Sequence, residues 1–117
     1  MRRISAKDLP QPLTTRVERH RDTVVLIASG ELDLAHSERL RTQLLELIGS
    51  SPRVVVDLRE IEFIDSTGLH CLLHVAGASH AAGRAFALIR GPERVQRLFE
   101  LTGTEEQFQF VDDASLR

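Results

Sequence analysis

The chain has 117 residues with a formal net charge of −2, and it is 42% hydrophobic and 27% charged. These values favour one globular domain that buries its own core, and the single cysteine, Cys71, excludes an intramolecular disulfide. The weak net charge and the lack of Trp and Tyr argue against direct contact with nucleic acid. There is no signal peptide and no apolar run of membrane-spanning length, so we expect a cytoplasmic protein without membrane contacts.

The N-terminal third predicts a tail followed by a β-hairpin. Residues 1–12 are polar and contain Pro10 and Pro12, so we expect a flexible tail, with residues 13–117 as a single domain. Residues 13–19 alternate in polarity, which predicts a strand with one wet face. A polar turn at residues 20–22 leads to TVVLIAS, an apolar run typical of a strand buried on both faces, and the two strands should pair.

The first predicted helix covers residues 36–49. Residues 30–33 (GELD) end the preceding strand, and Gly49 and Pro52 stop the helix. Its N-cap is open, because Asp33 and Ser37 compete with His36 for this position. Its apolar stripe consists of Leu40, Leu44, Leu45 and Ile48.

The second half alternates strands and helices. The predicted order is a buried strand at 54–58, a loop at 59–63, a helix at 66–82, a strand at 85–89, a helix between Gly91-Pro92 and Gly103, and a short strand at 108–111. The stripes of these two helices are Leu69, Leu72, Leu73 and Ala76, and then Val95, Leu98 and Phe99. A hairpin followed by this alternation predicts an α/β fold with a mixed sheet.

The stretch IEFIDSTGL, residues 61–69, carries the most chemical information. An apolar stretch ends at Asp65 and a helix begins at once, so Ser66 and Thr67 lie at its N-cap or in its first turn. The simplest interpretation of Ser66 is helix capping.

A second interpretation of Ser66 is a phosphorylation switch. A helix N-terminus accommodates a phosphate through its free N–H groups and its dipole. Asp65 adjoins the serine, and Asp33 ends a strand that should lie beside it, so phosphate would make this surface sharply anionic. A partner docked there would lose affinity without any movement of the backbone.

Three segments in register carry a family resemblance: GELD at 30–33, FIDSTGL at 63–69 and VQRLFELTG at 95–103. Together they resemble the STAS domain family, and within it the anti-sigma factor antagonists, over residues 13–111. The resemblance implies a STAS-like fold whose helices pack mainly on one face of the sheet. The chain differs in having His36 where the family often has Ser or Thr, and in having only residues 112–117 where the family carries a final helix.

The resemblance also implies a mechanism, known as partner switching. The unphosphorylated protein would bind an anti-sigma factor that is also a serine kinase, and so free a sigma factor for transcription. Phosphorylation of Ser66 by that kinase would end binding, and a PP2C-type phosphatase would restore it. The protein would be a monomer or weak dimer without cofactor or metal. Its expected partner-binding residues are Asp33, Asp65, Ser66, Thr67, Gly68, Leu69 and His70.

Two other functions remain as alternatives. A serine hydrolase would need a nucleophile elbow, GxSxG, but Ile64 occupies the first glycine position and no histidine is clearly placed as the base. Aspartic proteases read D-T/S-G without the inserted residue of this DSTG run. A STAS domain could also act as a phosphorylation-independent scaffold or transport accessory, although a hydroxyl at position 66 disfavours this.

The second predicted helix also carries two histidines and the cysteine. His70 and His74 share a face at zinc-binding spacing, but no third ligand is evident, so we interpret them as surface residues at a partner interface. Cys71 has no neighbouring Cys, Lys or Arg in the sequence to lower its pKa, which indicates a partly buried structural thiol.

Overall fold

The structure, a computed structural model, describes residues 11–116. All but the last two residues of the predicted tail, 1–12, lie outside this range. The elements are β1 (Thr14–His20), β2 (Thr23–Leu32), α1 (Ser37–Ser50), β3 (Arg53–Ile64), α2 (Ser66–Ala81), β4 (Ala85–Ile89) and α3 (Glu93–Thr102), followed by 3₁₀ turns η2 (Glu105–Gln107) and η3 (Asp113–Leu116). The predicted helices and the first four predicted strands are confirmed, and most of their ends agree with the structure to within a few residues.

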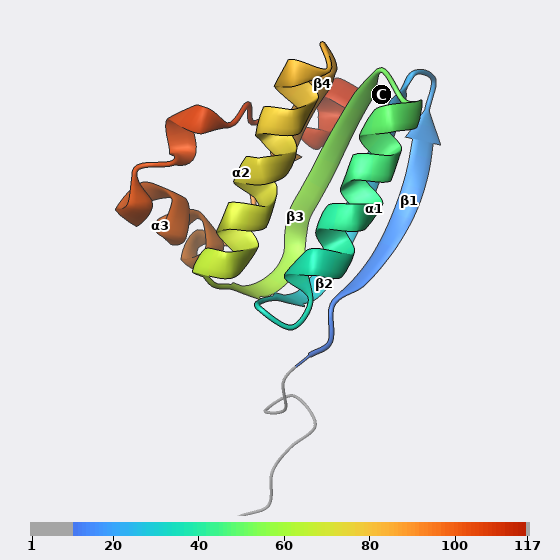
Figure 1. The fold of residues 1–117 in the computed structure, drawn as a ribbon. Helices are drawn as coiled ribbons and strands as arrows, with labels where there is room; N and C mark the ends of the chain where they lie inside the picture. The colour runs from blue at the N-terminus through green and yellow to red at the C-terminus, as the bar shows by residue number, and fades with distance from the viewer. Residues whose placement is uncertain (1–10, 117) are drawn as a thin grey trace, which may run out of the picture.

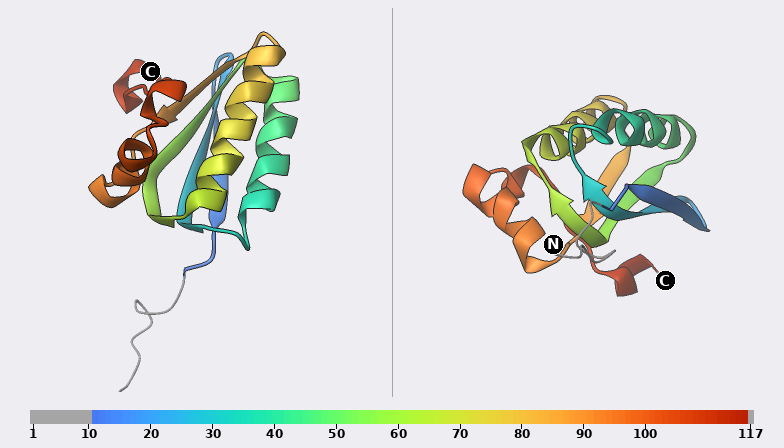
Figure 2. Two further views of the ribbon diagram at one scale, coloured as in Figure 1. Left: turned by 60° about the vertical axis from the view of Figure 1, so that its left-hand side comes forward. Right: turned by 90° about the horizontal axis from the view of Figure 1, so that it is seen from below.

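The sheet has the order β1-β2-β3-β4, with β1 antiparallel to β2 and the other pairs parallel. The predicted hairpin and mixed sheet are therefore confirmed. Helices α1 and α2 lie side by side on one face, whereas the C-terminal segment with η3 crosses the opposite face (Figure 2). Helix α3 packs beside the sheet, with most of its sheet contacts to β3 (Figure 1).

Apolar residues are buried on both faces of the central strands. The face under α1 and α2 buries Leu26, Leu40 and Leu44 completely, and Ile48 nearly so. The opposite face holds a second cluster, Val25, Ile27, Val55, Ala87 and Ile89, against which Val111 and Leu116 pack. The prediction that residues 23–29 are buried on both faces is confirmed. Leu45, predicted on the α1 stripe, is only half-buried.

The predicted loop at residues 59–63 is wrong, because β3 continues through it to Ile64. The pairing of β2 with β3 shifts register between Ile27 and Ser29 and again after Gly30, which has a φ of +97°. A β-bulge adds a residue and reverses the inward–outward alternation that identifies a strand. Beyond the bulge, Ile61 and Ile64 are buried again, so β3 delivers Asp65 and Ser66 to the carboxyl end of the sheet.

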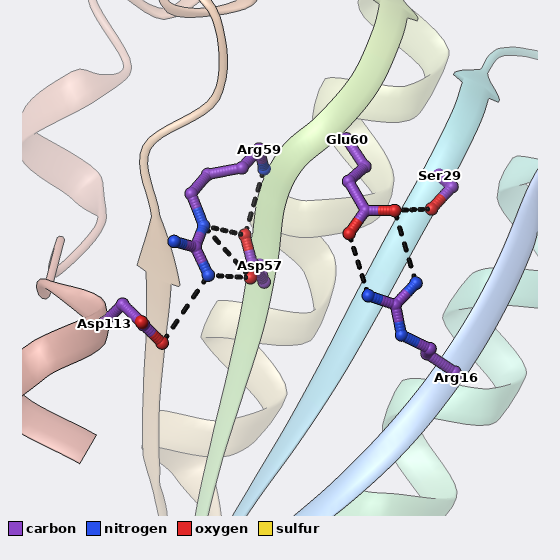
Figure 3. A network of polar contacts seen from close by, with 6 residues as sticks. All are labelled: Arg16, Ser29, Asp57, Arg59, Glu60 and Asp113. Carbon is purple, nitrogen blue, oxygen red and sulfur yellow. Dashed lines mark hydrogen bonds and ion pairs between the residues drawn. The ribbon is translucent and has the colours of Figure 1, made fainter. Parts of the chain in front are cut away.

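Two polar networks hold the bulge on the face opposite α1 and α2 (Figure 3). The buried Asp57 carboxylate accepts hydrogen bonds from the backbone N–H of Arg59, at 3.0 Å, and from its guanidinium, at 2.7 Å. That carboxylate raises the pKa of the Arg59 guanidinium. Glu60 beside it accepts from the Arg16 guanidinium, at 2.9 Å, and from the Ser29 hydroxyl, at 2.7 Å. The contacts of these charged pairs link β1, β2 and β3 where the ladder is irregular.

The predicted final strand at 108–111 forms only one bridge, between Leu88 and Phe110. The N–H of Leu88 donates to the Gln109 carbonyl, and the N–H of Val111 donates to the Leu88 carbonyl, each at 2.9 Å. The 3₁₀ turns η2 and η3 bound the segment and limit its length. Phe108 and Phe110 instead pack edge-on against Phe99, with ring centroids 5.3 and 5.7 Å away.

Candidate functional site

Ser66 is the first residue of α2, and the cap of this helix is Asp65. The backbone of Asp65 is extended, with φ −108° and ψ −177°, and its Oδ1 accepts the Gly68 N–H at 2.9 Å. The Ser66 side chain is exposed, and its hydroxyl makes no hydrogen bond within residues 11–116. The capping interpretation of Ser66 is therefore wrong, because Asp65 performs that role and leaves the serine hydroxyl free.

The Asp65 carboxylate also holds the loop between β2 and α1. Its Oδ2 accepts the Leu34 N–H at 3.3 Å, and its backbone N–H donates to the Leu32 carbonyl, also at 3.3 Å. One side chain thus caps α2 and fixes the neighbouring loop. The prediction that the strand ending near Asp33 lies beside the strand that leads to Ser66 is confirmed, because β2 pairs with β3 in parallel as far as Leu32 and Ile64.

Asp33 shapes the loop that Asp65 holds. Its Oδ1 accepts the Ala35 N–H at 3.1 Å and lies 2.7 Å from His36 Nδ1. Its carbonyl accepts the Ser37 N–H at 2.9 Å. His36 takes the N-cap position of α1 but makes no side-chain cap, so Asp33 supports the helix start from outside it.

Gly68 allows α2 to press against β2. A Cβ at this residue would lie 2.4 Å from the Leu32 carbonyl oxygen and 2.8 Å from Leu32 Cγ. Leu69 beside it is 2% exposed. Of the seven predicted partner-binding residues, these two lie beneath the surface, whereas Ser66 and His70 are exposed and Asp33, Asp65 and Thr67 are half-buried.

Two exposed apolar side chains near Ser66 were not identified from the sequence. Leu34 is 75% exposed in the loop held by Asp65, and Phe63 is 48% exposed near the end of β3. Single exposed apolar side chains are common on protein surfaces, and these two are candidates for partner contact because of their position: the N–H of Leu34 is bonded to Asp65, and Phe63 lies two residues before it. Their exposure has no sequence signal, because an apolar residue beside a strand is by default assigned to the core.

The two histidines and the cysteine of α2 lie in different environments. His70 and His74 are both exposed. Cys71 is 6% exposed, and burial raises the pKa of its thiol to about 11 although Arg41 opposes the shift. The structural thiol is therefore confirmed. Within residues 11–116, no group of three or more His, Cys, Asp or Glu side chains is arranged to hold a metal ion.

Comparison with known proteins places the chain in a family. The family model described as "Mlab, STAS domain" matches residues 15–112. The anti-sigma F factor antagonist of Paenibacillus polymyxa is 30% identical over 93 residues, which cover 78% of this chain and 80% of the relative. The anti-sigma-F factor antagonist RsfB of Mycobacterium tuberculosis is 29% identical over 103 residues, which cover 86% of this chain and 82% of the relative.

A solved structure extends this result to three dimensions. The crystal structure of an anti-sigma factor antagonist from Mycobacterium paratuberculosis superimposes with a TM-score of 0.74 at 28% identity, covering 87% of each chain. The chain therefore belongs to the STAS domain family, as its motifs predicted. No helix within residues 11–116 is long and apolar enough to cross a membrane.

Proposed function

We propose that this protein is an anti-sigma factor antagonist, which binds an anti-sigma factor in the cytoplasm and thereby frees a sigma factor. Relatives that align with most of the chain carry this name. The observation that carries the proposal is the exposed hydroxyl of Ser66 at the first residue of α2, which has no hydrogen-bond partner among residues 11–116 and stands next to a cap made by Asp65. A residue that neither caps its helix nor packs in the core is available to a partner.

Phosphorylation of Ser66 would be the switch. The Ser66 oxygen would attack the γ-phosphorus of ATP held by the anti-sigma factor kinase, ADP would leave, and the hydroxyl proton would pass to a base of the kinase. The helix N-terminus favours the resulting phosphate, so the fold would be kept. The phosphate adds about −1.5 to −2 charge beside Asp33 and Asp65, which repels a partner docked on this surface.

Each predicted contact residue has a role in this scheme. Ser66, Thr67 and His70 would touch the partner, together with the exposed side chains of Leu34 and Phe63. Asp33 and Asp65 would hold the two loops in place and contribute charge, and the buried Gly68 and Leu69 would fix the position of α2. A PP2C-type phosphatase would hydrolyse the phosphoserine and restore binding.

The site supports the role of a kinase substrate better than that of a hydrolase. A serine nucleophile is activated by a base within hydrogen-bond reach, which is itself oriented by a third group. Within residues 11–116 the Ser66 hydroxyl has no such partner, and the nearby Asp65 carboxylate is engaged by Gly68 and Leu34. A phosphorylation-independent scaffold or transport accessory remains the second candidate.

The test is a kinase reaction followed by a binding measurement. Each anti-sigma factor kinase of the source organism is incubated with the chain and Mg-ATP, and the phosphate is mapped by mass spectrometry. We expect phosphate on Ser66, none on the Ser66→Ala variant, and phosphate still mapped to Ser66 in the matched Thr67→Ala variant. Phosphate on Thr67 alone would overturn the assignment of the acceptor.

The binding arm tests the switch itself. Ser66→Ala should stay bound to the kinase in the presence of ATP, whereas Ser66→Asp should bind poorly. If both variants bind equally tightly, the phosphorylation switch is wrong and the scaffold function is favoured. Turnover of ester substrates that Ser66→Ala abolishes would instead establish the hydrolase.

A further inference from the structure

A shallow groove of about 350 Å³ runs between α1 and α2 and begins next to the candidate site. Thr67 and the exposed Leu34 line it near the start of α2. Because α2 has 3.6 residues per turn, His70 and His74 continue from Ser66 along the same side of the helix, one and two turns on. The groove therefore continues the surface around Ser66.

The groove is lined by one arginine and two histidines, which can pair with a negatively charged ligand. Helix α1 contributes the Arg41 guanidinium, and α2 contributes the imidazoles of His70 and His74. Hydroxyls of Ser37 and Thr67 are further hydrogen-bond donors along it.

The opposing groups are few. The acid facing the groove is Glu38 of α1, whose Oε1 accepts a hydrogen bond from Arg41 at 2.8 Å and so neutralises it in part. The thiol of Cys71 faces the groove from α2 and stays neutral, because its pKa is about 11. From the adjoining loop, Asp33 and His36 are paired with each other at 2.7 Å. The imidazoles of His70 and His74 are therefore the groups that decide the charge of the groove, whereas the whole chain has a net charge of −2.

We propose that the groove binds an acidic, partly apolar segment of the anti-sigma factor that docks at Ser66. This inference rests on the proposed function and extends its contact surface along α2. Carboxylates of the segment would pair with Arg41, His70 and His74, and an apolar side chain of the segment would pack on Leu34. Charge complementarity selects this occupant, because Arg41 and Glu38 largely offset each other and His70 and His74 are the remaining groups of the groove that can carry charge, both of them cationic.

The groove also gives phosphorylation a second way to release the partner. His70 lies four residues after Ser66, a spacing at which helical side chains interact. A phosphate on Ser66 would attract the His70 imidazolium and place negative charge at the mouth of the groove. The acidic segment would then lose a cation and meet a repulsive charge, while the backbone stays where it is.

The test compares charge reversals at two places on α2 in the full chain. Affinity for the kinase that phosphorylates Ser66 is measured by calorimetry at pH 7.5 for His70→Glu/His74→Glu. The control is His80→Glu, because His80 is exposed on the same helix but lies outside the groove. We expect about tenfold weaker binding for the double variant, and a change of less than about twofold for the control. Urea midpoints and circular dichroism check that all variants are folded.

A pH series supplies a second readout. A lower pH increases the cationic fraction of histidine side chains in general. Wild-type affinity should therefore rise several-fold between pH 8 and pH 6, and His70→Gln/His74→Gln should remove most of that rise while His80→Gln keeps it. Unchanged binding by the double reversal, or an unchanged pH dependence in the double Gln variant, would overturn the groove proposal alone. If wild-type protein binds no anti-sigma factor at any pH, the proposed function itself is wrong.

Discussion

Gly68 is the residue at which the sequence most directly controls the geometry of the site. A Cβ there would lie 2.4 Å from the Leu32 carbonyl oxygen, a backbone atom of a buried strand that cannot turn aside. Overpacking of this kind costs about 1–3 kcal/mol or more, and the higher helix propensity of alanine returns at most about 1 kcal/mol. Because the contact is with backbone, the cost should lie at the upper end of this range, and we expect Gly68→Ala to lower the free energy of unfolding by about 2 kcal/mol.

Gly77 provides a matched control on the same helix. It is exposed, and a Cβ there meets nothing within 4 Å. Gly77→Ala should therefore raise the free energy of unfolding by about 0.5–1 kcal/mol, through helix propensity and a less flexible unfolded chain. Both variants are measured by urea denaturation with fitted slopes. If Gly68→Ala is as stable as wild type, α2 does not press on β2 as described and the placement of Ser66 is wrong.

Three further predictions concern residues around the site. Asp65→Ala should lose about 2 kcal/mol of stability, since it removes both a cap and the bond to Leu34, whereas Asp65→Asn should lose about 1 kcal/mol because its one amide oxygen keeps the cap but cannot also accept the Leu34 N–H; equal losses in urea denaturation would contradict this. Leu34→Ala, at an exposed side chain, should weaken anti-sigma factor binding about fivefold while the urea midpoint stays unchanged, and unchanged affinity would remove Leu34 from the interface. The raised pKa of Cys71, about 11, means that its contribution to stability is present below about pH 9 and is lost as the pH rises towards 11 and beyond, by about 3 kcal/mol in all. The chain has no tyrosine and Lys7 is its one lysine, so Cys71→Ala should abolish most of this alkaline loss, and an equal loss in the variant would refute it.

Elements punctuated by glycine and proline were predictable from the sequence. The hairpin and the three helices follow from apolar periodicity and from stops such as Gly83 and Gly103. The continuation of β3 was not predictable, because the bulge leaves Arg59 and Glu60 both exposed and so interrupts the alternation that marks a strand. The positive φ of Gly30 and the Asp57 contacts that accommodate the bulge depend on the folded sheet.

The candidate site was predictable in its residues but not in their roles. Asp65 and Ser66 are both favourable N-cap residues, and only the backbone angles decide that Asp65 is extended and Ser66 is helical. Exposure of Leu34 results from the hydrogen bond of its N–H to Asp65, a contact between residues 31 positions apart. The groove that joins Arg41 to His70 likewise depends on how α1 packs against α2, which neither helix specifies alone.

The most direct test of the central claim is the affinity of the anti-sigma factor kinase for two forms of this chain, unmodified and stoichiometrically phosphorylated on Ser66. Both forms are titrated with the same kinase preparation in calorimetry, and circular dichroism verifies that the phosphorylated form keeps its fold. We expect phosphorylation to weaken binding by about 30- to 1,000-fold, equivalent to about 2–4 kcal/mol. Equal affinity of the two folded forms would contradict it.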